Sequence, residues 1–329
     1  MAKRFFLLLF VSLSTIMMSF ESFSFDENLN RRISAAGMFF LPEFSTAPAE
    51  PEVEAPSEPA VLPQLRSLEN TDLASRLRER INANPVWREL VRSKKMAIGV
   101  VDMANTAAVS YASINGRHMM YAASLPKIAV LAAAHDAIER GELKETATVR
   151  QDMRLMIAKS NNAATTRMID LVGFKNIERT MTSPALKLYD PEFGGGLWVG
   201  KRYAAGGNRH PDPMLGISHA ATTEQICRFF YLLANDQLLS PESSAKMRSY
   251  LVDPELHHKF VNTLDQVAPD AKVYRKSGSW STFHADVALV QGPARNYVMT
   301  ALIDDANGEQ ICRDLAKVLD DLLKHPVAK

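Results

Sequence analysis

Cysteine is scarce in this chain of 329 residues, which contains only Cys227 and Cys312. These two could form at most one disulfide, and an exported protein would permit it. Both lie in stretches with the apolar spacing of amphipathic helices, where a free buried cysteine behaves as a small hydrophobic residue. We therefore expect two buried thiols rather than a disulfide.

An excess of charge of either sign is also missing. The 38 basic and 37 acidic residues nearly cancel, so the overall charge gives no reason to expect a nucleic-acid partner. His257 and His258 are adjacent, and His210 and His219 have no cysteine or carboxylate pattern beside them. Because structural zinc sites need such spaced partners, we predict no metal and no cofactor.

A continuous apolar run long enough to cross a membrane is absent too. The N-terminal residues, MAKRFFLLLFVSLSTIMMSF, place Lys3 and Arg4 before an apolar stretch that is shorter than the roughly 20 residues a membrane span needs. This arrangement is typical of a secretory signal, with a weak cleavage site at Ser22-Phe23-Ser24. We expect a signal peptide at residues 1–24 and a periplasmic or secreted protein, or a membrane-tethered one if the signal is not cleaved.

The following stretch lacks apolar periodicity. Residues 45–63, STAPAEPEVEAPSEPAVLP, are rich in proline and glutamate, which is typical of an extended, disordered tether. A proline-rich docking motif is the alternative, although no PxxP sequence is accompanied by basic residues. We assign residues 25–67 to the tether and residues 68–329 to one folded domain.

Strand-like runs occur only near the two ends of that domain. They lie at 96–102 and 107–113, and then at 273–276, 284–291 and 296–304. Apolar spacing predicts helices from about 72 with a break at Pro85, and at 125–140, 151–158, 162–172, 222–235, 241–251 and 308–324. We predict an α/β (α+β) fold, with an antiparallel sheet of about five strands from both chain ends, flanking helices and an inserted all-helical lobe. A cleft between the lobes is a favourable ligand site.

The helix predicted at 125–140 follows Ser124-Leu125-Pro126-Lys127, an S-x-x-K sequence. Three residues make nearly one helical turn, so the serine and lysine share a face. A serine hydroxyl becomes a nucleophile when a base removes its proton, and a lysine can be that base once burial lowers its pKa. The alternative is a serine that only caps the helix.

Two other short polar sequences could contribute to the same chemistry. Ser160-Asn161-Asn162 lies between two predicted helices, and Lys276-Ser277-Gly278-Ser279 ends a predicted strand. A second serine can relay a proton, an amide can orient a carbonyl, and a lysine beside a hydroxyl can hold a carboxylate. Glycine lets the backbone approach closely, and a following N–H can complete an oxyanion hole. The alternatives are helix caps and a polar turn.

The order and spacing of these three motifs resemble the serine penicillin-recognising enzymes, and class A β-lactamases in particular. The order of the predicted elements resembles theirs over roughly residues 70–325. The resemblance implies that Ser124 is the acylated nucleophile and Lys127 its general base. It further implies that Ser160 relays a proton and that Asn162 contacts the substrate amide. Lys276 and Ser277 would bind the substrate carboxylate. The N–H groups of Ser124 and Ser279 would form the oxyanion hole.

The sequence departs from the class A pattern mainly in the loop after Ser160. The E-x-x-L-N pattern, whose glutamate activates the water that releases the acyl group, is missing. Glu192 lies near the expected place, but Gly196 stands where the pattern needs asparagine. We predict Glu192 as the water-activating base, with Asp190 an equal competitor and an exposed acid of no catalytic role the alternative. Smaller departures are Asn161 for aspartate and Ser277 for threonine.

Three functions follow from the resemblance. The first is an exported serine hydrolase of β-lactamase type, which forms a Ser124 acyl-enzyme and hydrolyses it. The second is a D,D-peptidase or other acyl hydrolase that acts on peptidoglycan-type peptides. The third is a domain that binds or senses β-lactams and deacylates slowly. We expect a small-molecule substrate (a β-lactam or an acyl-peptide), contact with the cell wall and a monomeric chain.

Overall fold

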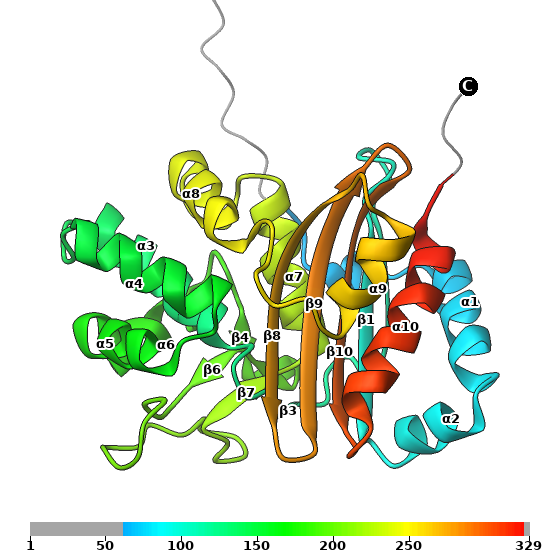
Figure 1. Cartoon of the computed structure of the whole chain (residues 1–329), viewed down its shortest axis with the longest axis horizontal. Helices are drawn as coiled ribbons and strands as arrows, with labels where there is room; N and C mark the ends of the chain where they lie inside the picture. The colour runs from blue at the N-terminus through cyan, green and yellow to red at the C-terminus, as the bar shows by residue number, and fades with distance from the viewer. Residues whose placement is uncertain (1–61, 326–329) are drawn as a thin grey trace, which may run out of the picture. The chain divides into compact units, whose positions relative to one another are not determined.

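A five-stranded antiparallel sheet forms the centre of residues 62–325, the part of the chain that the computed structural model describes. The strands are β1 (Met96–Asp102), β2 (Ser110–Ile114), β8 (Lys272–Trp280), β9 (Phe283–Gly292) and β10 (Arg295–Asp304), and they pair in the order β2-β1-β10-β9-β8. Figure 1 shows the early strand β1 beside the group of late strands. The prediction of one antiparallel sheet from both chain ends is confirmed.

Both faces of this sheet are covered, which explains why its strands are so apolar. In β1, Met96, Ile98 and Val100 face one hydrophobic core, while Ala97 and Val101 face the other. This alternation follows from the two-residue period of a strand. A strand buried on both faces has no solvent side to carry polar residues, so it reads as a nearly continuous apolar run.

Four helices cover the first face: α1 (Thr71–Asn82), α2 (Pro85–Arg92), α9 (Phe260–Val267) and α10 (Gly308–Leu323). The predicted break at Pro85 is confirmed, because Asn84 caps a new helix there, with Pro85 at its first position. On the other face lies α7 (Thr223–Ala234), whose residues are nearly all buried.

The helical lobe contains α3 (Lys127–Glu139), α4 (Ala147–Ala158), α5 (Asn162–Val172), α6 (Phe174–Thr182) and α8 (Pro241–Leu251). Figure 1 shows these helices grouped beside the β8 edge of the sheet. Residues 128–134 of α3 are fully buried, so α3 is the central helix of the lobe. A helix that is apolar all round must be covered on every side, and the predicted lobe is confirmed.

The loop from Ser183 to Thr222 contains short elements that were not predicted. They are β4 (Tyr189–Asp190), the 3-10 helix η2 (Pro191–Phe193), β5 (Gly195–Gly196), β6 (Trp198–Val199) and β7 (His219–Ala221). β7 pairs with both β6 and β3 (Met120–Tyr121). This small sheet ties the loop to the segment just before Ser124.

Other details differ from the predictions. The helices α6 and α9 were not predicted, and α3 begins at Lys127 rather than at residue 125. Residues 62–67, predicted as tether, contact the domain: η1 (Leu65–Leu68) buries Leu65, and the Pro63 carbonyl accepts a hydrogen bond from Arg228. The predicted signal peptide and the rest of the tether lie outside the described residues.

Both cysteines are free and buried, which confirms the prediction of two buried thiols. Burial raises the pKa of each thiol. None of the helices within residues 62–325 combines the length and apolarity needed to cross a membrane.

Candidate active site

Ser124 lies in a tight turn immediately before α3. Ala123 adopts a φ of 50°, in the left-handed region, and Leu125 N–H donates to the Ala122 carbonyl at 3.0 Å. A strained residue beside a reactive one is a common feature of functional sites. None of the hydrogen bonds within residues 62–325 involves the Ser124 hydroxyl, so its oxygen has no competing partner.

Lys127 is the first residue of α3 and is fully buried. Its Nζ lies 2.6 Å from the Ser160 carbonyl, 3.2 Å from Ser160 Oγ and 2.8 Å from Asn162 Oδ1. The Tyr203 ring lies beneath it, with its centroid 4.6 Å from Nζ. Burial lowers the pKa of Lys127 from 10.5 to about 7, so a large fraction of this side chain is a neutral amine near neutral pH.

The contacts of Lys127 are satisfied in either protonation state. An ammonium donates to Ser160 Oγ, the Ser160 carbonyl and Asn162 Oδ1. A neutral amine donates to the carbonyl and to Asn162 Oδ1 and accepts from the Ser160 hydroxyl. The loss of charge therefore costs Lys127 none of these contacts.

Ser160 joins two lysines. Its Oγ also accepts a hydrogen bond from Lys276 Nζ at 2.9 Å, and its φ of 52° places it in the left-handed region. Burial, followed by the repulsion of Lys127, lowers the pKa of Lys276 well below its usual value. The order Lys276, Ser160, Lys127 is a continuous hydrogen-bonded path that a proton could follow.

Gly278 brings strand β8 against the Ser124 turn. A Cβ at this position would lie 2.3 Å from the Ala122 carbonyl oxygen and 2.6 Å from Ser124 N. Only glycine allows that approach. Lys276 and Ser277 are buried on β8 and Ser279 is exposed, so the motif extends from the interior to the surface beside Ser124.

A cleft of about 830 Å³ adjoins this cluster. Asn162 and Tyr203 belong both to its wall and to the cluster, because Tyr203 donates to the Ala123 carbonyl at 2.9 Å. Within the described part of the chain, the wall includes four aromatic side chains and three cationic ones, but no aspartate or glutamate: Tyr121, Tyr203, Trp280, Phe283, Lys201, Arg202 and Arg209. Such a lining suits a partly apolar ligand that carries negative charge.

Comparison with known proteins decides the family. Residues 76–154 and 144–323 match the model of the Beta-lactamase enzyme family. The chain belongs to the β-lactamase enzyme family. Its fold and its family are those of serine β-lactamase-like hydrolases. A comparison with curated proteins found no match.

Solved structures of β-lactamase type share the fold at low identity. A β-lactamase from Sphaerobacter thermophilus is 19% identical, with a TM-score of 0.59 over 75% of this chain and 96% of that one. PBP-A is 17% identical, with a TM-score of 0.55 over 77% and 97%. A mutant of the class A β-lactamase of the last common ancestor of Gram-negative bacteria is 16% identical, with a TM-score of 0.57 over 76% and 97%.

The β-lactamase-like site of this chain gathers most of the predicted residues but not Glu192. Ser124, Lys127, Ser160 and Asn162 meet the segment from Lys276 to Ser279 at the β8 edge. Glu192 lies in η2 with an exposed side chain, outside the wall of the cleft. Next to it, Phe193 packs under Arg66, and Asp190 pairs with Arg66 at 3.8 Å. The structure therefore brings neither acid to Lys127.

Two aromatic residues beside the cluster are not among the predicted site residues. The rings of Tyr203 and His219 are in tilted contact, with their centroids 4.2 Å apart, and both residues line the cleft. His219 Nε2 lies 3.1 Å from the Lys201 carbonyl, which can only accept, so this nitrogen carries the proton. Burial lowers the pKa of His219 to about 4.

Within residues 62–325, no three histidine, cysteine, aspartate or glutamate side chains come close enough to hold an ion. His257 pairs with Asp265, and His210 with Glu178.

Proposed function

We propose that this chain is a serine hydrolase that forms an acyl-enzyme on Ser124 with a β-lactam or related amide and then hydrolyses it. One observation carries the proposal: Lys127 is fully buried, with its pKa lowered to about 7, and follows by three residues a serine hydroxyl that has no hydrogen-bond partner within residues 62–325. A lysine activates a serine only when it is neutral. Burial supplies that condition here.

Acylation would begin when Lys127 exchanges one of its present partners for the Ser124 hydroxyl. Lys127 then takes the proton, and Ser124 Oγ attacks the carbonyl carbon. The negative oxygen that results accepts hydrogen bonds from the N–H groups of Ser124 and Ser279. As the C–N bond breaks, Ser160 passes a proton from Lys127 to the leaving nitrogen. Lys276 and Ser277 hold the substrate carboxylate.

Deacylation needs a base for water. Glu192 was predicted for this role, but its side chain is exposed and does not line the cleft. After acylation Lys127 is neutral again, and its position supports Lys127 as the base. Since no carboxylate of residues 62–325 lines the cleft, we expect deacylation to be slower than acylation.

A second function rests on the same observation. A site without a carboxylate to activate water releases a β-lactam's acyl group slowly. An enzyme with such a site is blocked by a β-lactam although it turns over a peptide. The fold is shared with PBP-A. We therefore propose D,D-peptidase or related acyl-hydrolase activity on peptidoglycan-type peptides as the alternative, and a β-lactam-sensing domain if turnover is absent.

Stopped-flow kinetics separates these functions. The full chain is mixed with a chromogenic cephalosporin and, separately, with a peptide that ends in D-Ala-D-Ala, alongside Ser124→Ala. We expect a burst of cephalosporin opening, equal to the amount of enzyme, followed by slow turnover. Peptide cleavage without steady cephalosporin turnover favours the alternative, and activity retained in Ser124→Ala overturns the proposal.

We also propose export, on the sequence of residues 1–24. The residues concerned lie outside the described part of the chain, so the support is the charged and apolar pattern alone. Expression of the full chain in a bacterium, followed by N-terminal sequencing of the fractionated protein, tests it. A mature periplasmic chain that begins near residue 25 is expected, whereas an intact N-terminus in the cytoplasm contradicts export.

A further inference from the structure

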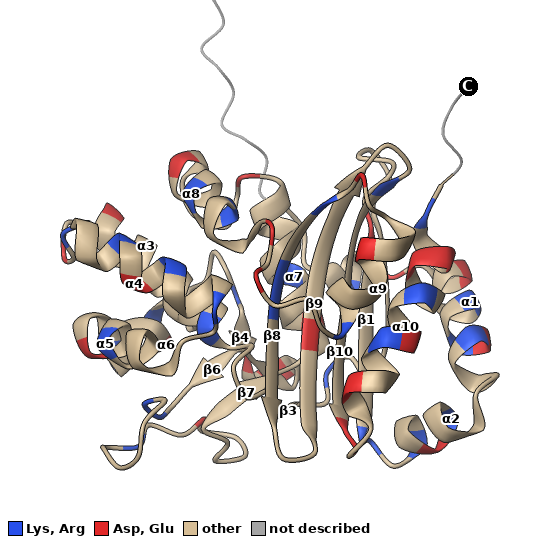
Figure 2. Ribbon diagram, in the orientation of Figure 1, with Lys and Arg blue, Asp and Glu red and all other residues tan. Residues whose placement is uncertain are grey.

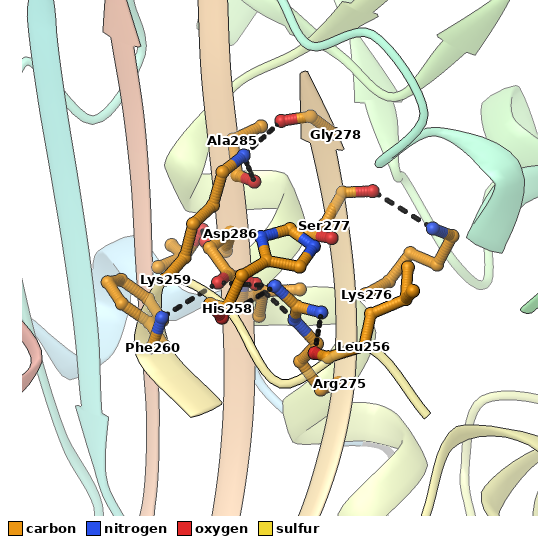
Figure 3. A network of polar contacts seen from close by, with 12 residues as sticks. Leu256, His258, Lys259, Phe260, Arg275, Lys276, Ser277, Gly278, Ala285 and Asp286 are labelled. Carbon is orange, nitrogen blue, oxygen red and sulfur yellow. Dashed lines mark hydrogen bonds and ion pairs between the residues drawn. The ribbon is translucent and has the colours of Figure 1, made fainter. Parts of the chain in front are cut away.

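Lys259 is a third buried lysine near the site, and the mechanism above does not use it. Its side chain is fully buried. Its Nζ donates to the carbonyl of Gly278 on β8 and, at 3.2 Å, to that of Ala285 on β9. Figure 3 shows the side chain reaching between the two strands to the Gly278 oxygen. Gly278 thus contacts Lys259 through its carbonyl oxygen and packs its Cα against the Ser124 turn.

An independent set of contacts fixes the segment that carries Lys259. Arg275 donates from Nε to Asp286 at 2.7 Å and from Nη2 at 2.9 Å. The same guanidinium bonds the carbonyls of Leu256 and His258, and Asp286 accepts from Phe260 N–H at 3.1 Å. In Figure 2 the basic segment of β8 lies beside the acidic position of β9, the two strands that contribute Arg275 and Asp286.

The backbone of Lys259 is strained. Its φ is 55°, a region that costs a residue with a Cβ energy and persists only where the surroundings impose it. The contacts of Arg275 and Asp286 on either side supply that constraint. A strained, buried lysine would be a costly way to fill space, because burial also lowers the pKa of its amine.

The geometry of a trans peptide connects Lys259 to the reaction. In such a peptide the C=O and the following N–H point in opposite directions, and no cis peptide occurs in the described residues. The Gly278 carbonyl points to Lys259, so Ser279 N–H points away from it. Hydrogen bonding to a carbonyl also polarises the amide and strengthens its N–H as a donor.

We propose that Lys259 is a positioning residue for acylation, whose Nζ fixes and polarises the Gly278–Ser279 peptide so that Ser279 N–H serves as an oxyanion donor. This inference rests on the proposed acylation of Ser124. The effect acts on the transition state rather than on substrate binding, because charge develops on the oxygen only during the reaction.

The test compares full chains carrying Lys259→Met, which removes the donor, Lys259→Arg, which keeps one, and Thr300→Val as a matched control. Thr300 is also buried and donates to a carbonyl of β9, that of Asp286 at 2.9 Å. The ¹⁵N shift of the Ser279 amide is measured without substrate. Single-turnover kinetics with a chromogenic cephalosporin then gives the acylation rate and the dissociation constant separately.

We expect Lys259→Met to shift the Ser279 resonance upfield and to slow acylation about 10- to 100-fold with little change in dissociation constant. This is less than the loss of about 100- to 1000-fold from removing an oxyanion-hole donor outright. Lys259→Arg should recover part of the rate, and Thr300→Val should leave both readouts near wild type. If Lys259→Met does not fold, Lys259→Gln takes its place, and an intermediate effect is expected.

An unchanged Ser279 resonance and acylation rate in a folded Lys259→Met chain overturn the inference. Equal losses in Lys259→Met and Thr300→Val also overturn it, because they show a general weakening of the sheet. If wild type forms no Ser124 adduct but the resonance shifts, the proposed function fails while the contact of Lys259 to the peptide is upheld.

Discussion

At the scale of single residues, the site depends on what burial does to amines. Two lysines, Lys127 and Lys276, share one acceptor, Ser160 Oγ. Both lie in the interior, and both pKa values are lowered. Two ammonium groups that bond the same oxygen repel each other, so the loss of charge on one lysine stabilises the charged form of the other. Of the two, Lys127 is the one placed to act as a base, because it follows Ser124 by three residues.

The acylation rate should therefore depend on pH through Lys127. The active form is the neutral amine, and its pKa is about 7. We expect the single-turnover acylation rate to fall about tenfold per pH unit below 7 and to reach a plateau near pH 8. A rate that stays constant down to pH 5 would show that Lys127 is not the base, and a rate that still rises toward pH 10 would show that the pKa of Lys127 is not lowered.

At the scale of elements, strand β8 and the turn before α3 are one unit. Gly278 leaves no room for a side chain between β8 and Ser124. Lys276 and Ser277 on one side and Ser279 on the other obtain their positions from this contact. This close contact explains why a glycine occurs within strand β8.

Gly278→Ala should disturb both stability and acylation. Its methyl group would meet backbone atoms of Ala122 and Ser124, which cannot turn away as a side chain could. We expect a loss of about 1–3 kcal/mol in the free energy of unfolding and an acylation rate lowered about 100-fold. Gly292→Ala, at the far end of β9 beside Ala271, is the control and should acylate normally. Equal acylation rates in the two variants would contradict this account.

The ion pair between β8 and β9 should be costly to break. Arg275 and Asp286 are both almost fully buried, and Asp286→Asn leaves a buried guanidinium without its counter-charge. We expect the free energy of unfolding in urea to fall by about 3–5 kcal/mol. The double variant Arg275→Met with Asp286→Leu should recover much of that loss. A change below about 1 kcal/mol for Asp286→Asn would be within the range of surface ion pairs and would contradict the burial.

At the scale of the whole molecule, the described domain has two cores separated by the sheet. Cys227 on α7 belongs to one core and Cys312 on α10 to the other. The early and late strands were predictable because double burial makes their sequences distinctly apolar. The Ser183–Thr222 loop was not, since its short strands pair through backbone groups and its glycines conceal any periodicity.

The same reasoning separates the parts of the site. Ser124, Lys127, Ser160 and Asn162 were predictable because their chemistry lies in side chains at a recognisable spacing. Tyr203 and Lys259 bond backbone carbonyls, those of Ala123 and Gly278. Every residue carries a carbonyl, so a sequence contains no signal for such contacts.

The two thiols report on both cores together. Burial raises the pKa of each cysteine, and the reactive form is the thiolate. We expect the native chain to react negligibly with Ellman's reagent over minutes, and the chain unfolded in guanidinium to release two equivalents at once. Rapid reaction of one native thiol would show that its core opens locally.

Intact mass spectrometry of the full chain mixed with a cephalosporin, sampled from seconds to an hour, tests the central claim most directly. The account predicts a mass increase equal to one acyl group, mapped by peptide digestion to Ser124, absent from Ser124→Ala and strongly slowed in Lys127→Met. It also predicts that the adduct accumulates before it clears, because none of the described residues that line the cleft is a carboxylate. An adduct on another residue, or none in a folded chain, would contradict the account.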